Sequence, residues 1–68
     1  MISPLAVVET SEIGVDVRIA EFAIIRHGAV IGNRAIIHPH VVIEANVVIG
    51  DDAEIFPGSY IGKMPKAP

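Results

Sequence analysis

The sequence contains no cysteine, and aromatic residues make up only 4% of its 68 positions. The fold therefore has neither a disulfide to staple it nor a thiolate metal site. The apolar fraction is 51%, which excludes a disordered chain and predicts a core of Ile, Val and Ala in a thin, regular stack. A domain of this size buries only about 60% of the surface that its unfolded chain exposes. Self-association is the expected source of further stability.

The chain also has no cluster of Lys and Arg and no long apolar run, and its net charge is −3. It thus lacks the basic surface that nucleic-acid binding requires. The opening segment lacks the basic n-region of a signal peptide, and polar or turn residues interrupt every apolar stretch well short of the roughly 20 residues of a membrane span. We expect a soluble, cytoplasmic protein that binds neither nucleic acid nor membranes.

Isoleucine is what the sequence has in excess, and it recurs at every sixth position. Nine of the twelve isoleucines share one register, from Ile13 through Ile61, and Val7 extends this register one step toward the N-terminus. A fixed period of this kind is typical of repeat architectures. It matches neither an ordinary helix nor an ordinary hairpin.

Each repeat divides into a short strand and a bend. Residues two apart share one face of a strand, so the residue two before each isoleucine also points inward. These residues are small or β-branched: Ser11, Val17, Ala23, Ala29, Ala35, Val41, Val47, Ala53 and Ser59. The third and fourth positions of each repeat are rich in turn residues. Gly28, Asn46 and Gly58 occupy the fourth position, where a positive φ is least costly for these residue types.

A slower period of eighteen residues shows how the short strands stack. Gly14, Gly32 and Gly50 recur at this spacing, as do Pro39 and Pro57. Three hexapeptides therefore make one coil, a triangle of short strands that pairs with the next coil at about 4.8 Å. The predicted fold class is an all-β parallel β-helix of about three triangular coils.

The ends of such a stack need caps, because their backbone groups are unpaired. Proline lacks a backbone donor, and Ser3-Pro4 at the start, with Pro65 and Pro68 at the end, are weak candidates for this role. We assign residues 1–64 to the hexapeptide-repeat β-helix and residues 65–68 to a Pro-rich tail.

Three units match a known pattern of an aliphatic residue, Gly, two variable residues and a small residue: 13–18, 31–36 and 49–54. In this the chain resembles the left-handed β-helix acyltransferases of the hexapeptide-repeat class. The opening segment, residues 2–9 followed by Ile13-Gly14, looks like the first coil of the nucleotide-sugar N- and O-acyltransferases. The resemblance implies a left-handed helix, a homotrimer, acetyl-CoA or acyl-CoA as co-substrate between subunits, and a sugar or nucleotide-sugar acceptor. Family enzymes carry more coils, so the chain looks like the N-terminal portion of such an enzyme or a small stand-alone relative.

His38 is the candidate catalytic residue. Histidines offer the only obvious acid–base chemistry in the chain, and the resemblance implies a histidine as general base on the acceptor hydroxyl or amine. His38 directly follows the inward Ile37, so it points outward, stacked between Ala20 and Phe56 of the neighbouring coils. A surface or interface histidine is the alternative interpretation.

Other polar side chains are weaker candidates for a catalytic role. His27 and His40 lie at corners and are expected to face solvent, whereas Glu44 and Glu54 point outward as orienting carboxylates or as solvated charges. No residue is assigned to cofactor binding.

A zinc site is a further alternative, because related β-helix proteins of the γ-carbonic-anhydrase type share three histidines across a subunit boundary. His38-Pro39-His40 is the only close pair, and a face position and a corner position point their side chains apart. We assign no metal ligand. The glycines follow the repeat and do not form a phosphate-binding GxxxxGK loop.

The outward aliphatic residues indicate where the chain would contact a partner. One face carries Ile24, Val42 and Tyr60, while Ile36, Val30 and Val48 point outward elsewhere. An aliphatic stripe is typical of a subunit interface, although single surface aliphatics are also normal. Two functions follow as hypotheses: an acyl-CoA-dependent acyltransferase acting on a small-molecule acceptor, or a non-catalytic β-helix module for assembly.

Overall fold

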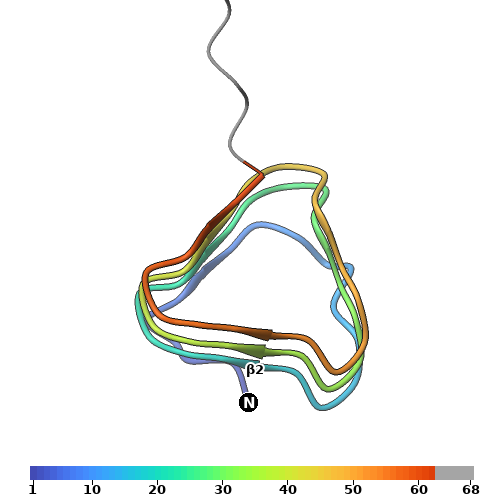
Figure 1. The fold of residues 1–68 in the computed structure, drawn as a ribbon, viewed down its shortest axis with the longest axis horizontal. Coiled ribbons are helices and arrows are strands. Elements are labelled where there is room, and N and C mark those ends of the chain that lie inside the picture. The colour runs from blue at the N-terminus through green and yellow to red at the C-terminus, as the bar shows by residue number, and fades with distance from the viewer. Residues whose placement is uncertain (63–68) are drawn as a thin grey trace, which may run out of the picture.

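The computed structural model describes residues 1–62, which form a stack of short parallel strands. The strands are β1 (Val7–Val8), β2 (Arg18–Ile19), β3 (Ile24–Ile25), β4 (Val30–Ile31), β5 (Ile36–Ile37), β6 (Val42–Ile43), β7 (Val48–Ile49), β8 (Glu54–Ile55) and β9 (Tyr60–Ile61). They pair into three sheets, which form the three sides of a triangular prism (Figure 1). We call β2-β5-β8 the first face, β1-β3-β6-β9 the second face and β4-β7 the third face.

The predicted eighteen-residue coil is confirmed by the register of these sheets. Ile19 pairs with Ile37, and Ile37 pairs with Ile55, in parallel throughout. The chain makes about three turns and winds in the left-handed sense that the resemblance implies (Figure 1). No helix of the length and apolarity needed to cross a membrane occurs within residues 1–62. The tail assigned to 65–68, with Pro65 and Pro68, lies outside the described residues, as do positions 63 and 64.

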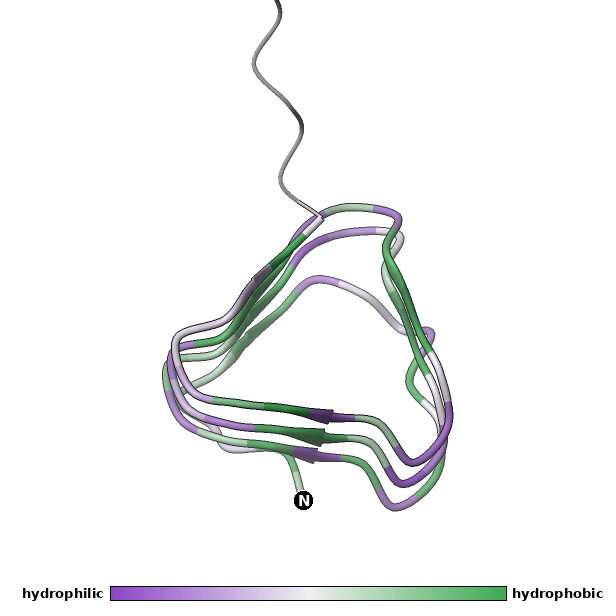
Figure 2. Cartoon of the chain, viewed as in Figure 1, coloured by the Kyte–Doolittle hydropathy of each residue, from purple (hydrophilic) through white to green (hydrophobic). Residues whose placement is uncertain are grey.

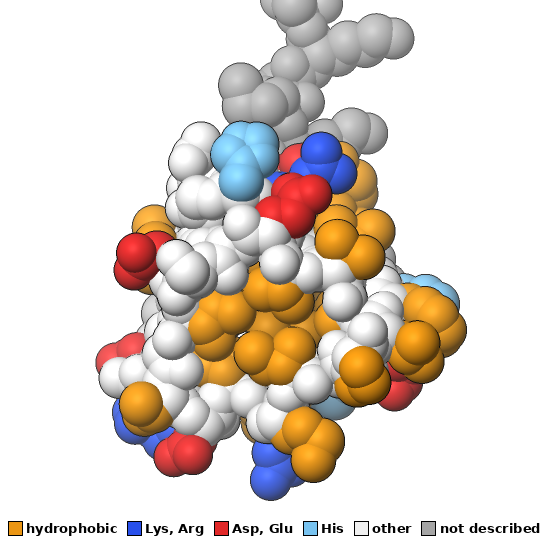
Figure 3. All heavy atoms as spheres, turned by 180° about the vertical axis from the view of Figure 1, so that it is seen from behind, with side chains coloured by type: hydrophobic (Ala, Val, Ile, Leu, Met, Phe, Trp, Pro, Cys, Tyr) orange, Lys and Arg blue, Asp and Glu red, His pale blue; other side chains and the backbone are white. Residues whose placement is uncertain are grey.

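The core follows the predicted alternation. Apolar and polar residues alternate along the coils (Figure 2), and the end of the prism seen in Figure 3 has hydrophobic side chains at its centre and charged ones around its rim. The buried residues are Val17, Ile19, Ala23, Ile25, Ala29, Ile31, Ala35, Ile37, Val41, Ile43 and Ile49. Each is an isoleucine of the ladder or the small residue two positions before it. The central coil is thus the best buried.

The first coil departs from the six-residue register, and the predictions for Val7 and Ser11 are wrong. Val8, and not Val7, pairs with Ile25, so Val7 points outward and is 51% exposed. Val8 and Ile13 are five positions apart instead of six, and a shift of one residue turns a side chain to the other side of a strand. At this shorter corner Ser11 is exposed, and the Thr10 hydroxyl donates a hydrogen bond to the Ala29 carbonyl at 2.7 Å.

Every regular corner has a positive φ at the fourth position of the repeat, whatever residue occupies it. Gly28, Asn46 and Gly58 behave as predicted. The same conformation occurs at Asp16, Phe22, Arg34, His40 and Asp52, with φ between 57° and 63°. For ordinary L-residues it costs roughly 1–2 kcal/mol each. The stacked coils impose this bend even where the local residue disfavours it.

Candidate functional site

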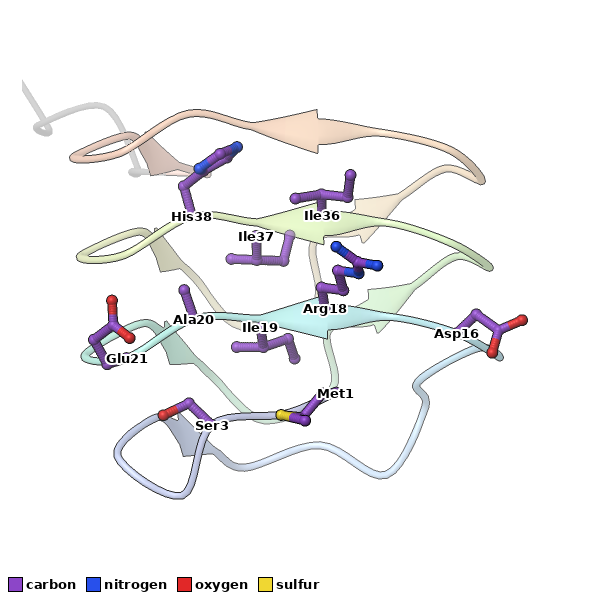
Figure 4. A pocket seen from close by; sticks show the side chains of 10 residues that line it. All are labelled: Met1, Ser3, Asp16, Arg18, Ile19, Ala20, Glu21, Ile36, Ile37 and His38. Atoms are coloured by element: carbon purple, nitrogen blue, oxygen red, sulfur yellow. The ribbon is translucent and has the colours of Figure 1, made fainter.

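A shallow groove of about 690 Å³ lies on the first face, toward the N-terminal end of the stack (Figure 4). Strand pairing produces it. The residue after each core isoleucine forms an outward column of Ala20, His38 and Phe56, and Ser3 stands at the corresponding place in the first coil. Because Ala20 and Ser3 are small, the surface beside His38 is hollow.

His38 stands at the edge of this groove and is held on two sides. Its Nε2 atom lies 2.8 Å from Oε2 of Glu54, and its ring stacks on Phe56 with centroids 5.6 Å apart and an interplanar angle of 19°. An ionised carboxylate only accepts hydrogen bonds, so Nε2 donates to Glu54. In the neutral ring, Nδ1 then keeps a lone pair. This arrangement fixes the orientation of a group that can accept a proton.

Charged side chains surround the centre of the groove. Arg18 projects from β2 below Ile36, and Asp16 and Glu21 stand at the two corners that flank this strand (Figure 4). The groove thus combines one central cation with two peripheral carboxylates.

Two polar pairs outside the groove join successive coils. Arg34 donates two hydrogen bonds to the Asp52 carboxylate, at 2.7 and 3.1 Å. This contact raises the pKa of Arg34 and lowers the pKa of the Asp52 carboxyl. On the second face the Tyr60 hydroxyl donates to Glu44, which raises the pKa of Tyr60. Both pairs are exposed, so we assign them a structural role.

The remaining predicted residues are not brought to His38. His40 stacks on Phe22 at its corner, with centroids 5.3 Å apart, and His27 lies 4.0 Å from Glu9 at another. His38 and His40 therefore pair with different phenylalanine rings. Within residues 1–62 no group of three or more His, Asp or Glu side chains is placed to hold a metal ion.

Sequence reasoning placed His38 between Ala20 and Phe56 and named Glu54, but it missed the groove. Asp16, Arg18 and Glu21 were not singled out, and Ser3 was named only as part of a weak cap. The available signal was the outward position of Arg18, two residues before the small Ala20 on the same side of the coil.

Comparison with known proteins identifies the same six-residue repeat. Two overlapping segments, residues 10–45 and 28–63, match the family model described as bacterial transferase hexapeptide (six repeats). The two segments begin one eighteen-residue coil apart, and together they cover most of the chain. No curated protein and no solved structure matches the chain.

Proposed function

Because the chain belongs to the bacterial transferase hexapeptide family, we propose that it takes part in acyl transfer from acetyl-CoA or another acyl-CoA to a hydroxyl or amine of a sugar or nucleotide sugar. The observation that carries the proposal is the hydrogen bond between His38 and Glu54 beside a groove on the first face. A histidine held by a carboxylate is a common arrangement for a general base.

The proposed step uses the free nitrogen of His38. Nδ1 takes the proton of the acceptor hydroxyl or amine while the acceptor atom attacks the thioester carbonyl carbon. The tetrahedral intermediate then expels the CoA thiolate, and the imidazolium returns the proton to the leaving sulfur. Glu54 holds the ring in position and stabilises its positive charge throughout the step.

Binding and turnover with acetyl-CoA test this proposal. Isothermal titration comes first, and absence of binding at millimolar ligand contradicts the enzymatic function. With an acceptor that the parent chain acylates, His38→Ala is expected to lower kcat by about 10²- to 10⁴-fold, the usual contribution of a general base. His27→Ala is the matched control, because His27 lies at a corner away from the groove, and it is expected to leave kcat unchanged. Turnover that persists in His38→Ala rules out this base.

We also propose that the chain assembles with itself through the second face, where Val7, Ile24, Val42 and Tyr60 stack in one outward column. Val7 and Tyr60 are each about half exposed, at 51% and 52%. A flat apolar column of this kind supports a subunit interface, and three copies around a threefold axis would give a closed ring. Self-assembly without catalysis is the alternative function. It predicts the trimer but no acyl-CoA binding.

A further inference from the structure

The three arginines of the chain differ in their partners. Arg34 is held by two hydrogen bonds to Asp52, and Arg26 lies 3.5 Å from Glu9. Arg18 forms no ion pair and no side-chain hydrogen bond with any residue between positions 1 and 62, and it stands in the middle of the groove (Figure 4). A guanidinium group offers five donors in a planar fork that matches a carboxylate or a phosphate.

The surroundings of Arg18 leave this fork directed into the groove. Its strand neighbour in the next coil is Ile36, whose side chain has no hydrogen-bond acceptor. The carboxylates of Asp16 and Glu21 stand at opposite corners of the first face (Figure 4), and neither forms an ion pair with the Arg18 guanidinium. The donors of Arg18 are therefore available to a ligand.

Arg18 and His38 lie on one surface at a separation that a small molecule spans. Arg18 pairs with Ile36, and His38 is two residues farther along the same strand direction. With strands about 4.8 Å apart and a rise of about 3.3 Å per residue, their Cβ atoms are about 8 Å apart. One sugar ring with an attached charged group has this scale. The small Ala20 keeps the space between them open.

We propose that Arg18 forms an anion-binding subsite for a polyhydroxylated ligand that carries one phosphate or carboxylate group. The two corner carboxylates accept hydrogen bonds from ligand hydroxyls. The subsite deepens the proposed acyl transfer, on which its role as an acceptor site rests, because it would set the acceptor beside His38. Anion binding itself does not require the chemistry of His38.

The test is a titration of the ¹⁵N-labelled protein followed by NMR, with three probes of similar size: a hexose 1-phosphate, a hexuronic acid and a neutral methyl hexoside. We expect the two anions to shift the amide signals of the first face at millimolar concentration and the neutral sugar to do so at least tenfold more weakly. The tighter of the two anions identifies phosphate or carboxylate as the preferred group, and either result supports the subsite.

Variants then assign the effect to Arg18. Arg18→Gln is expected to weaken anion binding about tenfold or more, and Arg18→Lys, which keeps the charge and loses the fork, should lie between this variant and the parent. Arg34→Gln is the matched control, since it removes an arginine outside the groove, and it should bind as the parent does. The same spectra show whether each variant is folded.

Three results would overturn the subsite: equal binding of the neutral sugar, no shifts on the first face with either anion, or unchanged affinity in Arg18→Gln. His38→Ala separates the two proposals. This variant should retain anion binding. A parent chain that binds the anions but does not bind acetyl-CoA would support the subsite and contradict the acyltransferase function.

Discussion

Gly32 lies so close to Asp51 of the next coil that a Cβ atom on Gly32 would stand 2.5 Å from the Asp51 backbone nitrogen. The Asp51 side chain is held there because its Oδ1 accepts the backbone N–H of Asn33 at 2.7 Å. One coil below, Oδ1 of Asn33 accepts the N–H of Val15 at 2.9 Å and crowds Gly14 in the same way. The glycines at eighteen-residue spacing therefore make room for a ladder of side-chain to backbone hydrogen bonds.

Gly32→Ala should destabilise the fold by about 1–3 kcal/mol, the usual cost of forcing extra atoms into a packed site. The clash is with backbone atoms, which cannot rotate away. Gly50→Ala is the matched control, because a Cβ atom at Gly50 meets nothing within 4 Å. Urea denaturation of both variants measures the difference, and equal stability of the two would contradict this account of the glycines.

The pair formed by Arg34 and Asp52 should make stability depend on acidic pH. The folded-state pKa of Asp52 lies below its ordinary value of 3.8, so the contribution is present above that value and is lost as pH falls through the lowered pKa. Asp52→Asn should therefore be less stable than the parent at neutral pH, and the difference should vanish at strongly acidic pH. Thermal melts across this range measure it.

Arg34→Gln removes the same pair from the other side and should reproduce the flattened pH profile of Asp52→Asn. Both effects should shrink at high ionic strength, because the pair is exposed. A variant that keeps the parent's acid profile would assign the pH dependence to another carboxylate.

The corner formed by Val15 and Asp16 provides a test of backbone strain. Asp16 has φ 57°. Asp16→Gly should therefore change the stability of the fold by no more than about 0.5 kcal/mol, because the loss of backbone strain at a positive φ offsets the greater entropy of glycine in the unfolded chain. Val15 is outside the left-handed region, and Val15→Gly should cost about 0.5–1 kcal/mol. Guanidinium denaturation measures the stability of both variants. A larger loss of stability in Asp16→Gly than in Val15→Gly would contradict this explanation.

Val42→Lys should abolish self-association, since it places a charge in the middle of the apolar column on the second face. Val48→Lys introduces the same charge at a valine of the third face that is 71% exposed, and it should assemble like the parent. Sedimentation velocity at micromolar concentration distinguishes the two. A monomeric parent, or equal dissociation by both variants, would remove the second face as the interface.

Several features of the site follow from the sequence because they depend only on local alternation and the coil length. The register puts His38 outward, between Ala20 and Phe56, and the stacking of His38 on Phe56 agrees with it. The same reasoning named Glu54 as an orienting carboxylate, and Glu54 is the side chain that contacts His38. Glu44 was named on equal grounds and instead contacts Tyr60, because the choice depends on which neighbour each flexible side chain reaches.

The first coil shows where the periodicity fails. A strict six-residue count places Val7 in the core, whereas the corner after Val8 is one residue short and turns Val7 outward. The isoleucine ladder begins only at Ile13, so the sequence carries no repeated marker for this shorter corner.

The sequence by itself determined the six-residue strand and bend, the eighteen-residue coil and the inward isoleucine ladder, because side-chain alternation and turn chemistry act within a few residues. Only the tertiary structure decided which exposed side chains meet across coils, where the groove opens, and that Arg18 faces it while Arg26 and Arg34 are paired. The side-chain contacts between coils join residues about sixteen to eighteen positions apart. They depend on side-chain size and reach between stacked coils, which a repeating pattern of apolar residues does not specify.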